Sequence, residues 1–161
     1  NSRDDFEQQI CQVCDNPAWK LIYRPQVDEA DTPAMAREAE YFCSAGREIE
    51  NVECFFDEVD SFFEAGPAPP ELKALLNFGR KHDVTMRGCV RRPQAKIPRD
   101  WITETTQFTI FRTCDPHDAV FLKRYTGIDH RDILSLRQFE YFEWLEGEVS
   151  RHTFQNPYKI A

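Results

Sequence analysis

The sequence has 161 residues, 41% of them hydrophobic and 30% charged, and its formal net charge is −8. This length suits a single domain with a buried core, so we expect one domain over residues 1–161. No apolar run approaches the roughly 18 to 20 residues that cross a bilayer, so we expect no membrane span. The chain does not begin with Met, and we expect Asn1 to be a processed end or a cut in a longer protein.

The six cysteines are not spaced as a disulfide framework or a zinc site. Several stand inside apolar runs, where a thiol behaves as a small buried hydrophobe. Cys11 and Cys14 form one C-x-x-C pair, but structural zinc needs about four ligands and no second pair has suitable spacing. We therefore expect reduced thiols in a cytoplasmic protein.

The charge is unevenly distributed along the chain. Residues 1–79 contain 17 acids and 6 bases, whereas residues 80–99 contain 7 bases and a single acid. Residues 100–161 are again acidic on balance, with 10 acids and 7 bases. A short basic segment in an acidic protein can meet a polyanion, although a solvated loop would have the same composition.

The first part of the chain alternates helical and extended patterns. Helical spacing with acids in the first turn predicts one helix, and a compact aromatic run ended by Pro25 predicts a strand. A second helix has Asp31 or Thr32 as its cap, Pro33 as its first residue and Gly46 as its end. The expected elements are a helix over 4–14, a strand over 19–23 and a helix over 33–45.

The alternation continues after the Gly- and Pro-rich loop 66–70. Helical spacing returns there, and later apolar runs have the composition of strands. Residues 139–154 alternate around Glu146-Gly147 and predict an antiparallel hairpin. The other expected elements are a helix over 71–82, a strand over 84–90, a short helix or turn at 101–102, a strand over 108–111 and a helix over 116–125 capped by Asp115 or its neighbour.

The run Val52 to Phe56 is nearly continuous in apolar character and ends at Asp57-Glu58. Such a run is typical of a central strand in a parallel sheet that is covered on both faces. Together with the alternation of strands and helices, it predicts an α/β fold with a mostly parallel sheet flanked by helices and a C-terminal antiparallel hairpin. Ligand sites in such sheets lie at the carboxyl ends of the strands, so Asp57 and Glu58 are placed to act.

An apolar strand that ends in Asp-Glu is the Walker B pattern of P-loop ATPases. Mg²⁺ requires hard oxygen ligands, and the group that orients the attacking water must be separate from the group that holds the metal. The pattern therefore assigns Asp57 to Mg²⁺ and Glu58 to the role of catalytic base. Acidic pairs after apolar runs also occur as plain helix caps, so the pair alone leaves both interpretations open.

Four segments together extend this likeness along the chain. They are VECFFDEVDSF from Val52, ELKALLNFGRKHDVTMRGCVRRPQAKIP from Glu71, QFTIFRTCDPHDAVFLKRYTG from Gln107 and FEYFEWLEGEVSRH from Phe139. Over roughly residues 19 to 155 the sequence resembles the second half of the FtsK/HerA class of P-loop ATPases. That class includes DNA translocases, Zot-like phage assembly proteins and viral genome-packaging ATPases.

The resemblance implies a P-loop NTPase-like fold of the RecA/ASCE type. It implies that ATP and Mg²⁺ are the cofactors and that ATP hydrolysis is coupled to translocation or packaging of DNA, bound without regard to its sequence. It also implies a homo-oligomeric ring, such as a hexamer, in the host-cell cytoplasm or in a virion.

Roles for several arginines and one lysine follow from the same resemblance. Arg91 precedes Arg92-Pro93 at the position where the class senses the γ-phosphate. Arg112 ends a strand and can stabilise phosphate charge in its own subunit or as an arginine finger, as Arg80 also could. The residues expected to contact DNA phosphates are Arg87, Arg92, Lys96 and Arg99. An ordinary surface position is the alternative for each of these side chains.

Two features depart from the class. Arg91 stands where members usually carry Gln or another small polar residue, so sensing would be altered. More seriously, none of the six glycines is followed by Lys, and the loop G-x-x-x-x-G-K-[ST] that grips the phosphates is absent. Either that loop precedes Asn1, or the chain is a non-hydrolysing homologue, or another chain supplies the grip. We expect the first.

Two other functions stay open at this point. In the first, Asp57, Glu58 and Asp60 bind the divalent ion of a Mg²⁺-dependent nuclease, although no Lys or His stands at a fixed spacing from them. In the second, the chain is a non-catalytic DNA-binding or assembly module that keeps the fold. Plasmid cleavage without nucleotide would favour the nuclease, and salt-sensitive DNA binding without ATP binding would favour the module.

Overall fold

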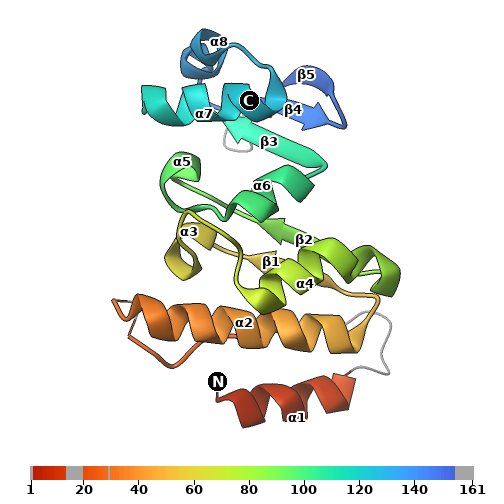
Figure 1. Ribbon diagram of the computed structural model, residues 1–161. Coiled ribbons are helices and arrows are strands. Elements are labelled where there is room, and N and C mark those ends of the chain that lie inside the picture. The colour runs from red at the N-terminus through yellow and green to blue at the C-terminus, as the bar shows by residue number, and fades with distance from the viewer. Residues whose placement is uncertain (1, 14–19, 29, 155–161) are drawn as a thin grey trace, which may run out of the picture.

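A computed structural model describes residues 2–13, 20–28 and 30–154 of the chain. In chain order its elements are α1 (Arg3–Val13), α2 (Thr32–Ile49), β1 (Glu53–Phe56), α3 (Val59–Phe62), α4 (Pro70–Phe78), the 3-10 helix η1 (Gly79–His82), β2 (Thr85–Gly88), α5 (Pro93–Lys96), α6 (Arg99–Glu104), β3 (Gln107–Phe111), α7 (Pro116–Thr126), α8 (His130–Ser135), β4 (Glu140–Leu145) and β5 (Glu148–Thr153). Figure 1 shows three tiers: α1 and α2 at one end, β1 and β2 with α3 and α4 in the middle, and β3 to β5 with α7 and α8 at the other end.

The middle tier contains a parallel pair of strands, β1 and β2, in which Phe56 lies opposite Gly88. The strands predicted at 52–56 and 84–90 are therefore confirmed. Burial alternates along β1: Cys54 and Phe56 are buried, whereas Phe55 is 52% exposed. The prediction of a central strand covered on both faces is wrong, because β1 pairs with β2 alone among the described strands and one face of the pair stays open.

The end tier contains an antiparallel sheet of β3, β4 and β5. The hairpin predicted over 139–154 is confirmed, and its turn places Glu146 and Gly147 at φ 49° and 98°. The strand predicted at 108–111 exists as β3, but it pairs antiparallel with β4. The α/β class is confirmed, whereas a mostly parallel sheet is wrong, because the described strands pair in parallel only between β1 and β2.

Helix α2 begins as the sequence predicts and ends later. The side chain of Asp31 accepts a hydrogen bond from the N–H of Ala34 at 3.0 Å, which caps the first turn. The predicted end at Gly46 is wrong, because the helix continues to Ile49. Gly46 is instead buried against β1, where a Cβ would lie 2.5 Å from the Sγ of Cys54. This glycine allows the helix and the strand to pack closely.

The larger core lies between α2, the β1–β2 pair, α4 and α6. Leu72 and Leu75 of α4 are 0% and 1% exposed, and Trp101 of α6 meets Phe56 edge-on with ring centroids 5.7 Å apart. The helix predicted over 71–82 forms in two parts, α4 and then η1, because the chain tightens into 3-10 geometry at Gly79. This core holds the carboxyl ends of β1 and β2 in place.

The N-terminal helix is confirmed as α1, but the strand predicted over 19–23 is wrong where it is described. Residues 20–28 have no regular secondary structure, and Trp19 lies outside the described residues. The ring of Tyr23 packs against Phe6 of α1 at 4.8 Å and stacks on Phe42 of α2 at 6.3 Å. Packing between two helices therefore accounts for Tyr23, whereas Ile22 of the same run is 68% exposed.

A polar cluster fastens α1 to α2. Glu38 accepts hydrogen bonds from the guanidinium of Arg3, at 2.9 Å, and from the hydroxyl of Tyr23. Burial by itself would raise the pKa of Glu38, but the hydrogen bonds from Arg3 and Tyr23 outweigh it and hold this pKa below its usual value. Burial and the hydrogen bond to Glu38 raise the pKa of Tyr23 to about 12.

We expect this cluster to make the stability of the fold fall at both ends of the pH scale. The contribution of Glu38 is present above its unfolded pKa of about 4.3 and is lost as the pH falls through the lower folded value. The contribution of Tyr23 is complete below about pH 10 and is lost as the pH rises toward its folded pKa. Thermal unfolding of Glu38→Gln should show a flatter acid limb than the wild type. Glu48→Gln, an exposed change on the same helix, should keep the wild-type limb, and equal limbs in Glu38→Gln and wild type would contradict the prediction.

A second core forms beneath the antiparallel sheet, around Ile133 and Leu136 at 0% and 1% exposed. Helix α7 confirms the prediction over 116–125, and Asp115 caps it by accepting a hydrogen bond from the N–H of His117 at 2.8 Å. The short helix α8 was not predicted, because six residues are too few for a periodic pattern. Phe108 of β3 packs against both cores and joins the two tiers.

No described helix combines the length and the apolar character needed to cross a membrane. Among the cysteines, Cys43 and Cys54 are buried free thiols, and burial raises the pKa of both, that of Cys54 to about 11. Cys14 lies outside the described residues, so the structure does not describe the C-x-x-C pair as a unit.

Candidate functional site

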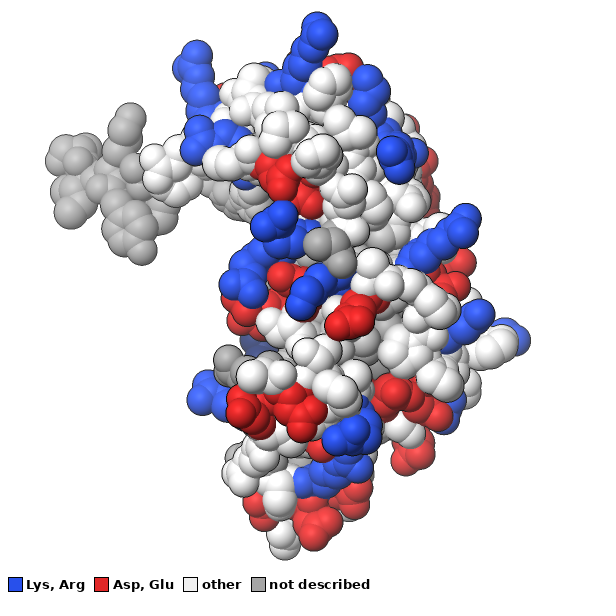
Figure 2. Space-filling view, turned by 60° about the vertical axis from the view of Figure 1, so that its left-hand side comes forward, with Lys and Arg blue, Asp and Glu red and all other residues white. Residues whose placement is uncertain are grey.

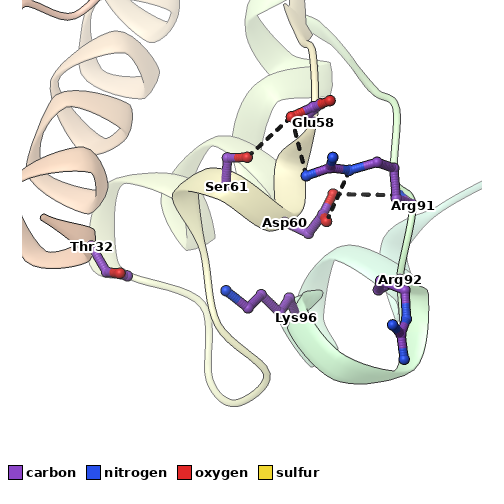
Figure 3. A pocket seen from close by; sticks show the side chains of 7 residues that line it. All are labelled: Thr32, Glu58, Asp60, Ser61, Arg91, Arg92 and Lys96. Carbon is purple, nitrogen blue, oxygen red and sulfur yellow. Dashed lines mark hydrogen bonds and ion pairs between the residues drawn. The ribbon is translucent and has the colours of Figure 1, made fainter. Parts of the chain in front are cut away.

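The carboxyl ends of β1 and β2 open into a pocket of about 590 Å³. Its walls come from the start of α2, the turn after β1, α3 and the segment after β2, as Figure 3 shows. The lining residues are Thr32, Glu58, Asp60, Ser61, Arg91, Arg92 and Lys96. This is the edge at which a parallel sheet places ligand-binding side chains.

Glu58 is held in the pocket by two partners. Its Oε2 accepts a hydrogen bond from the hydroxyl of Ser61 at 3.3 Å and lies 3.2 Å from Nη2 of Arg91. Its backbone has φ 56° and ψ 63°, a left-handed conformation that costs free energy for a residue with a Cβ. The turn is fixed by the N–H of Val59, which donates to the carbonyl of Cys89 after β2 at 2.9 Å. Strain of this kind is often found at functional sites.

Asp60 is the buried acid of the pocket, with a side chain that is 6% exposed. Its Oδ1 accepts a hydrogen bond from the backbone N–H of Arg91 at 3.3 Å, and its Oδ2 lies 3.6 Å from Nε of Arg91. Burying a carboxylate costs free energy unless it is paired and hydrogen-bonded in this way. One guanidinium therefore bridges Glu58 and Asp60. The sequence had suggested Asp60 only as a ligand in the nuclease alternative.

Asp57 stands outside the pocket although it precedes Glu58. It is exposed, and within the described part of the chain its side chain makes no hydrogen bond or ion pair. No group of three or more His, Cys, Asp or Glu side chains among the described residues is placed to hold a metal ion. An open carboxylate suits Mg²⁺, which keeps several waters and often binds one or two carboxylates together with substrate phosphates. The residues thus fit a water-rich magnesium site and not an all-protein metal cage.

Arg92 points away from the acids of the pocket in Figure 3. Its Nη2 lies 3.0 Å from Oδ2 of Asp115, and its Nε lies 3.4 Å from Oδ2 of Asp118. Asp118, which follows the cap of α7 by three residues, was not recognised as a site residue in the sequence. The acids in that first turn were the available signal, but they also suit a helix N-terminus by themselves.

Lys96, unlike Arg92, points into the pocket (Figure 3). Its side chain extends into the space between Thr32 and Asp60 in Figure 3, and its ammonium has no ion-pair partner within the described ranges. Thr32 and Ser61, whose hydroxyls line the same space, were not recognised as site residues in the sequence. Lys96 is therefore a cation of this pocket that no acid of the described residues pairs with, and it is available to an anion.

The other basic residues singled out from the sequence lie outside the pocket. Arg87 is paired across the open face of the sheet with Glu53 at 3.0 Å. Arg99 begins α6 and Arg112 follows β3, and both are exposed. Figure 2 shows Lys and Arg side chains near the middle of one face with Asp and Glu side chains directly beside them. Positive charge on this face is therefore mixed with negative charge.

The α/β fold of this chain is similar to that of solved NTPase structures. The genome packaging NTPase B204 from Sulfolobus turreted icosahedral virus 2, in complex with sulfate, matches 82% of this chain with a TM-score of 0.61 and 11% sequence identity. Its complex with ATP-gammaS matches equally, with a TM-score of 0.61 and 12% identity. B204 from Sulfolobus Turreted Icosahedral Virus, a DNA-packaging ATPase, matches 84% with a TM-score of 0.60 and 11% identity.

The match is one of fold. The chain spans 65% of the length of the sulfate-bound packaging NTPase. No protein-family model matches the sequence, and no curated protein does.

Proposed function

We propose that this chain belongs to a subunit of an ATP-driven motor that packages viral DNA or translocates DNA. The observation that carries the proposal is the position of Glu58, in a strained turn at the carboxyl end of β1 and directly opposite Arg91. The fold is shared with a genome-packaging NTPase whose structures hold sulfate, AMP and AMPPCP, which supports a nucleotide as the ligand here. A homo-oligomeric ring, in the host-cell cytoplasm or a virion, is part of the proposal.

The proposed roles follow from the positions of the acids. Glu58 takes the proton of the attacking water, because of the two adjacent acids Asp57 and Glu58 it is the one that lines the pocket. Asp57 is open to solvent and would hold Mg²⁺ through the water shell of the ion. When bound, ATP would supply the phosphoryl group that is transferred to water, and Mg²⁺ would neutralise the charge on the phosphate oxygens.

Two arginines complete the proposed site. Arg91 bridges Glu58 and Asp60, and its side chain is 64% exposed, so it can also meet a phosphate that enters the pocket. This would make Arg91 a sensor of the γ-phosphate. Arg112, exposed after β3, would stabilise phosphate charge in its own subunit or in the next.

The proposal requires a phosphate-binding loop, which these 161 residues do not contain. Backbone N–H groups and a lysine of such a loop hold the triphosphate against the metal and the base. Hydrolysis is therefore expected of a protein in which this chain works together with such a loop. The experiment measures ATP hydrolysis, with and without double-stranded DNA, by a protein or complex that contains both this chain and a phosphate-binding loop. DNA-stimulated turnover is the expected result, and absence of ATP turnover with and without DNA would refute the proposal.

For the DNA contact we propose Lys96 and Arg99, whose cations have no acidic partner in the described residues, ahead of the paired Arg87 and Arg92. Lys96→Gln should weaken binding to all duplex sequences alike. It should also reduce the slope of log affinity against log salt by about 0.9, because one phosphate contact is lost. Fluorescence anisotropy at several salt concentrations measures this slope. Lys73→Gln, an exposed change on α4, is the matched control, and an identical slope in both variants would contradict the contact.

One observation favours a second function, a non-hydrolysing DNA-binding or assembly module. The phosphate-gripping loop G-x-x-x-x-G-K-[ST] is absent from the sequence. A chain that bound DNA in a salt-dependent manner but took up no ATP, even beside a phosphate-binding loop, would have this function. The nuclease alternative gains no support, because Asp60 is buried against Arg91 and no cluster of three metal ligands lies among the described residues.

A further inference from the structure

Two consecutive arginines after β2 pair with different acids, and Figure 3 shows Arg91 pointing toward Glu58 and Asp60 while Arg92 points away from them. Arg91 reaches back to Glu58 and Asp60 in the turn after β1. Arg92 reaches forward to the first turn of α7, which belongs to the tier of the antiparallel sheet. The turn that carries the two arginines therefore joins the pocket to the second core.

Asp118 is the anchor of this turn on the side of α7. Its side chain is 3% exposed, and its Oδ2 lies 3.4 Å from Nε of Arg92. Its Oδ1 accepts a hydrogen bond from the backbone N–H of Gln94 at 3.1 Å, while its Oδ2 has no hydrogen-bond partner among the described residues. A buried carboxylate is costly unless a cation or hydrogen-bond donor lies close to it. Asp118 thus binds both neighbours of Pro93, whose ring already restricts the backbone.

Arg91 itself is held by contacts to two acids of the pocket, and its backbone is continuous with that of Arg92. Its N–H is tied to Asp60 at 3.3 Å, and its side chain is 64% exposed. The described contacts of the guanidinium are those to Glu58 and Asp60. A shift of the backbone at Arg92 would therefore move the point from which Arg91 reaches both acids.

We infer that Arg92 and Asp118 are positioning residues that fix Arg91 against Glu58. The role of Glu58 as a base rests on the proposed function, whereas the placement of Arg91 by Asp118 involves no nucleotide. Neither Arg92 nor Asp118 would touch the reacting atoms. Their contribution is to keep the base and the arginine opposite it in one arrangement.

The first experiment measures amide hydrogen exchange in the chain without nucleotide. Asp118→Asn keeps the size and the acceptor for Gln94 but removes the charge that faces Arg92. The N–H of Arg91 should then exchange about tenfold faster, because its local opening becomes easier. The N–H of Thr85, which donates to the carbonyl of Val52 at 3.0 Å in the β1–β2 pair, should keep its rate.

The matched control is Asp132→Asn, which neutralises an exposed acid on α8 and should change neither rate. Equal acceleration at Arg91 and Thr85 in Asp118→Asn would indicate a general loss of stability and would overturn the inference. An unchanged rate at Arg91 would overturn it as well.

The second experiment measures steady-state ATP hydrolysis in the protein that includes a phosphate-binding loop. Asp118→Asn should lower kcat about tenfold and leave KM for ATP unchanged, because the geometry of the base changes and the grip on the nucleotide does not. In a background that carries Arg91→Gln, the same substitution should have no further effect on kcat. Losses that multiply would show independent action and refute the inference. A wild-type protein without turnover would refute the proposed function instead, and the exchange result would still test the placement of Arg91.

Discussion

Glu58→Gln is expected to lower the turnover of ATP by about 100-fold or more while ATP still binds. Glutamine has the shape of glutamate and can still accept a hydrogen bond from Ser61, but it cannot take a proton from water. The substitution also removes the charge that Arg91 pairs with at 3.2 Å, so the arginine becomes available to a phosphate. Steady-state hydrolysis and equilibrium nucleotide binding, measured on the protein that includes a phosphate-binding loop, give the two quantities.

Glu64→Gln is the matched control, because Glu64 is an exposed acid a few residues further along and lies outside the pocket. Its turnover should equal that of the wild type. Wild-type turnover in Glu58→Gln would show that Glu58 is not the catalytic base. Asp57→Asn should instead raise the concentration of Mg²⁺ that half-maximal turnover requires, so the two substitutions distinguish a metal-binding acid from a catalytic base.

Gly46→Ala is expected to destabilise the fold by about 1 to 3 kcal/mol, the usual cost of overpacking a core. Helix propensity alone predicts the opposite, because alanine is about 1 kcal/mol better than glycine inside a helix. Packing decides the sign of the change in the free energy of unfolding, since the new Cβ would lie 2.5 Å from the buried Sγ of Cys54. Equilibrium unfolding in denaturant measures the free energy of unfolding.

A double variant provides the decisive control. Cys54→Ala removes the sulfur that the new methyl group would meet, so Gly46→Ala should cost less stability in that background than in the wild type. Ser44→Ala, on the same helix, should leave the free energy of unfolding nearly unchanged. A stabilising effect of Gly46→Ala, or equal costs in the two backgrounds, would show that the close contact is absent.

Signals carried within a few residues were sufficient for most elements. Asp31 and Asp115 cap the helices that the sequence assigned to them, and Glu146-Gly147 turns the hairpin. Such signals are local hydrogen bonds and dihedral preferences, which do not depend on the rest of the fold. Gly46 was misjudged for the same reason, because its conformational freedom suggested a helix end while its missing side chain served packing.

Sheet membership could not be obtained in that way. The apolar run over β1 suggested burial on both faces, yet Phe55 is 52% exposed. The run over β3 suggested a parallel strand, yet it pairs with β4. Tyr23, in the run predicted as a strand, packs between helices, and residues 20–28 form no strand. Composition reports that a segment is apolar, whereas the partner that covers it is chosen by the packing of the whole chain.

The acidic pair after β1 and the basic segment after β2 are visible in the amino-acid order, and so is their common location at the carboxyl ends of parallel strands. The tertiary structure decided that Glu58 faces the pocket while Asp57 does not, that Arg91 bridges Glu58 and Asp60, and that Arg92 turns to Asp118. These contacts join residues 31 positions apart in the case of Asp60 and the N–H of Arg91. Ion pairs between buried acids and exposed arginines form wherever folding brings them together, and no local propensity encodes that choice.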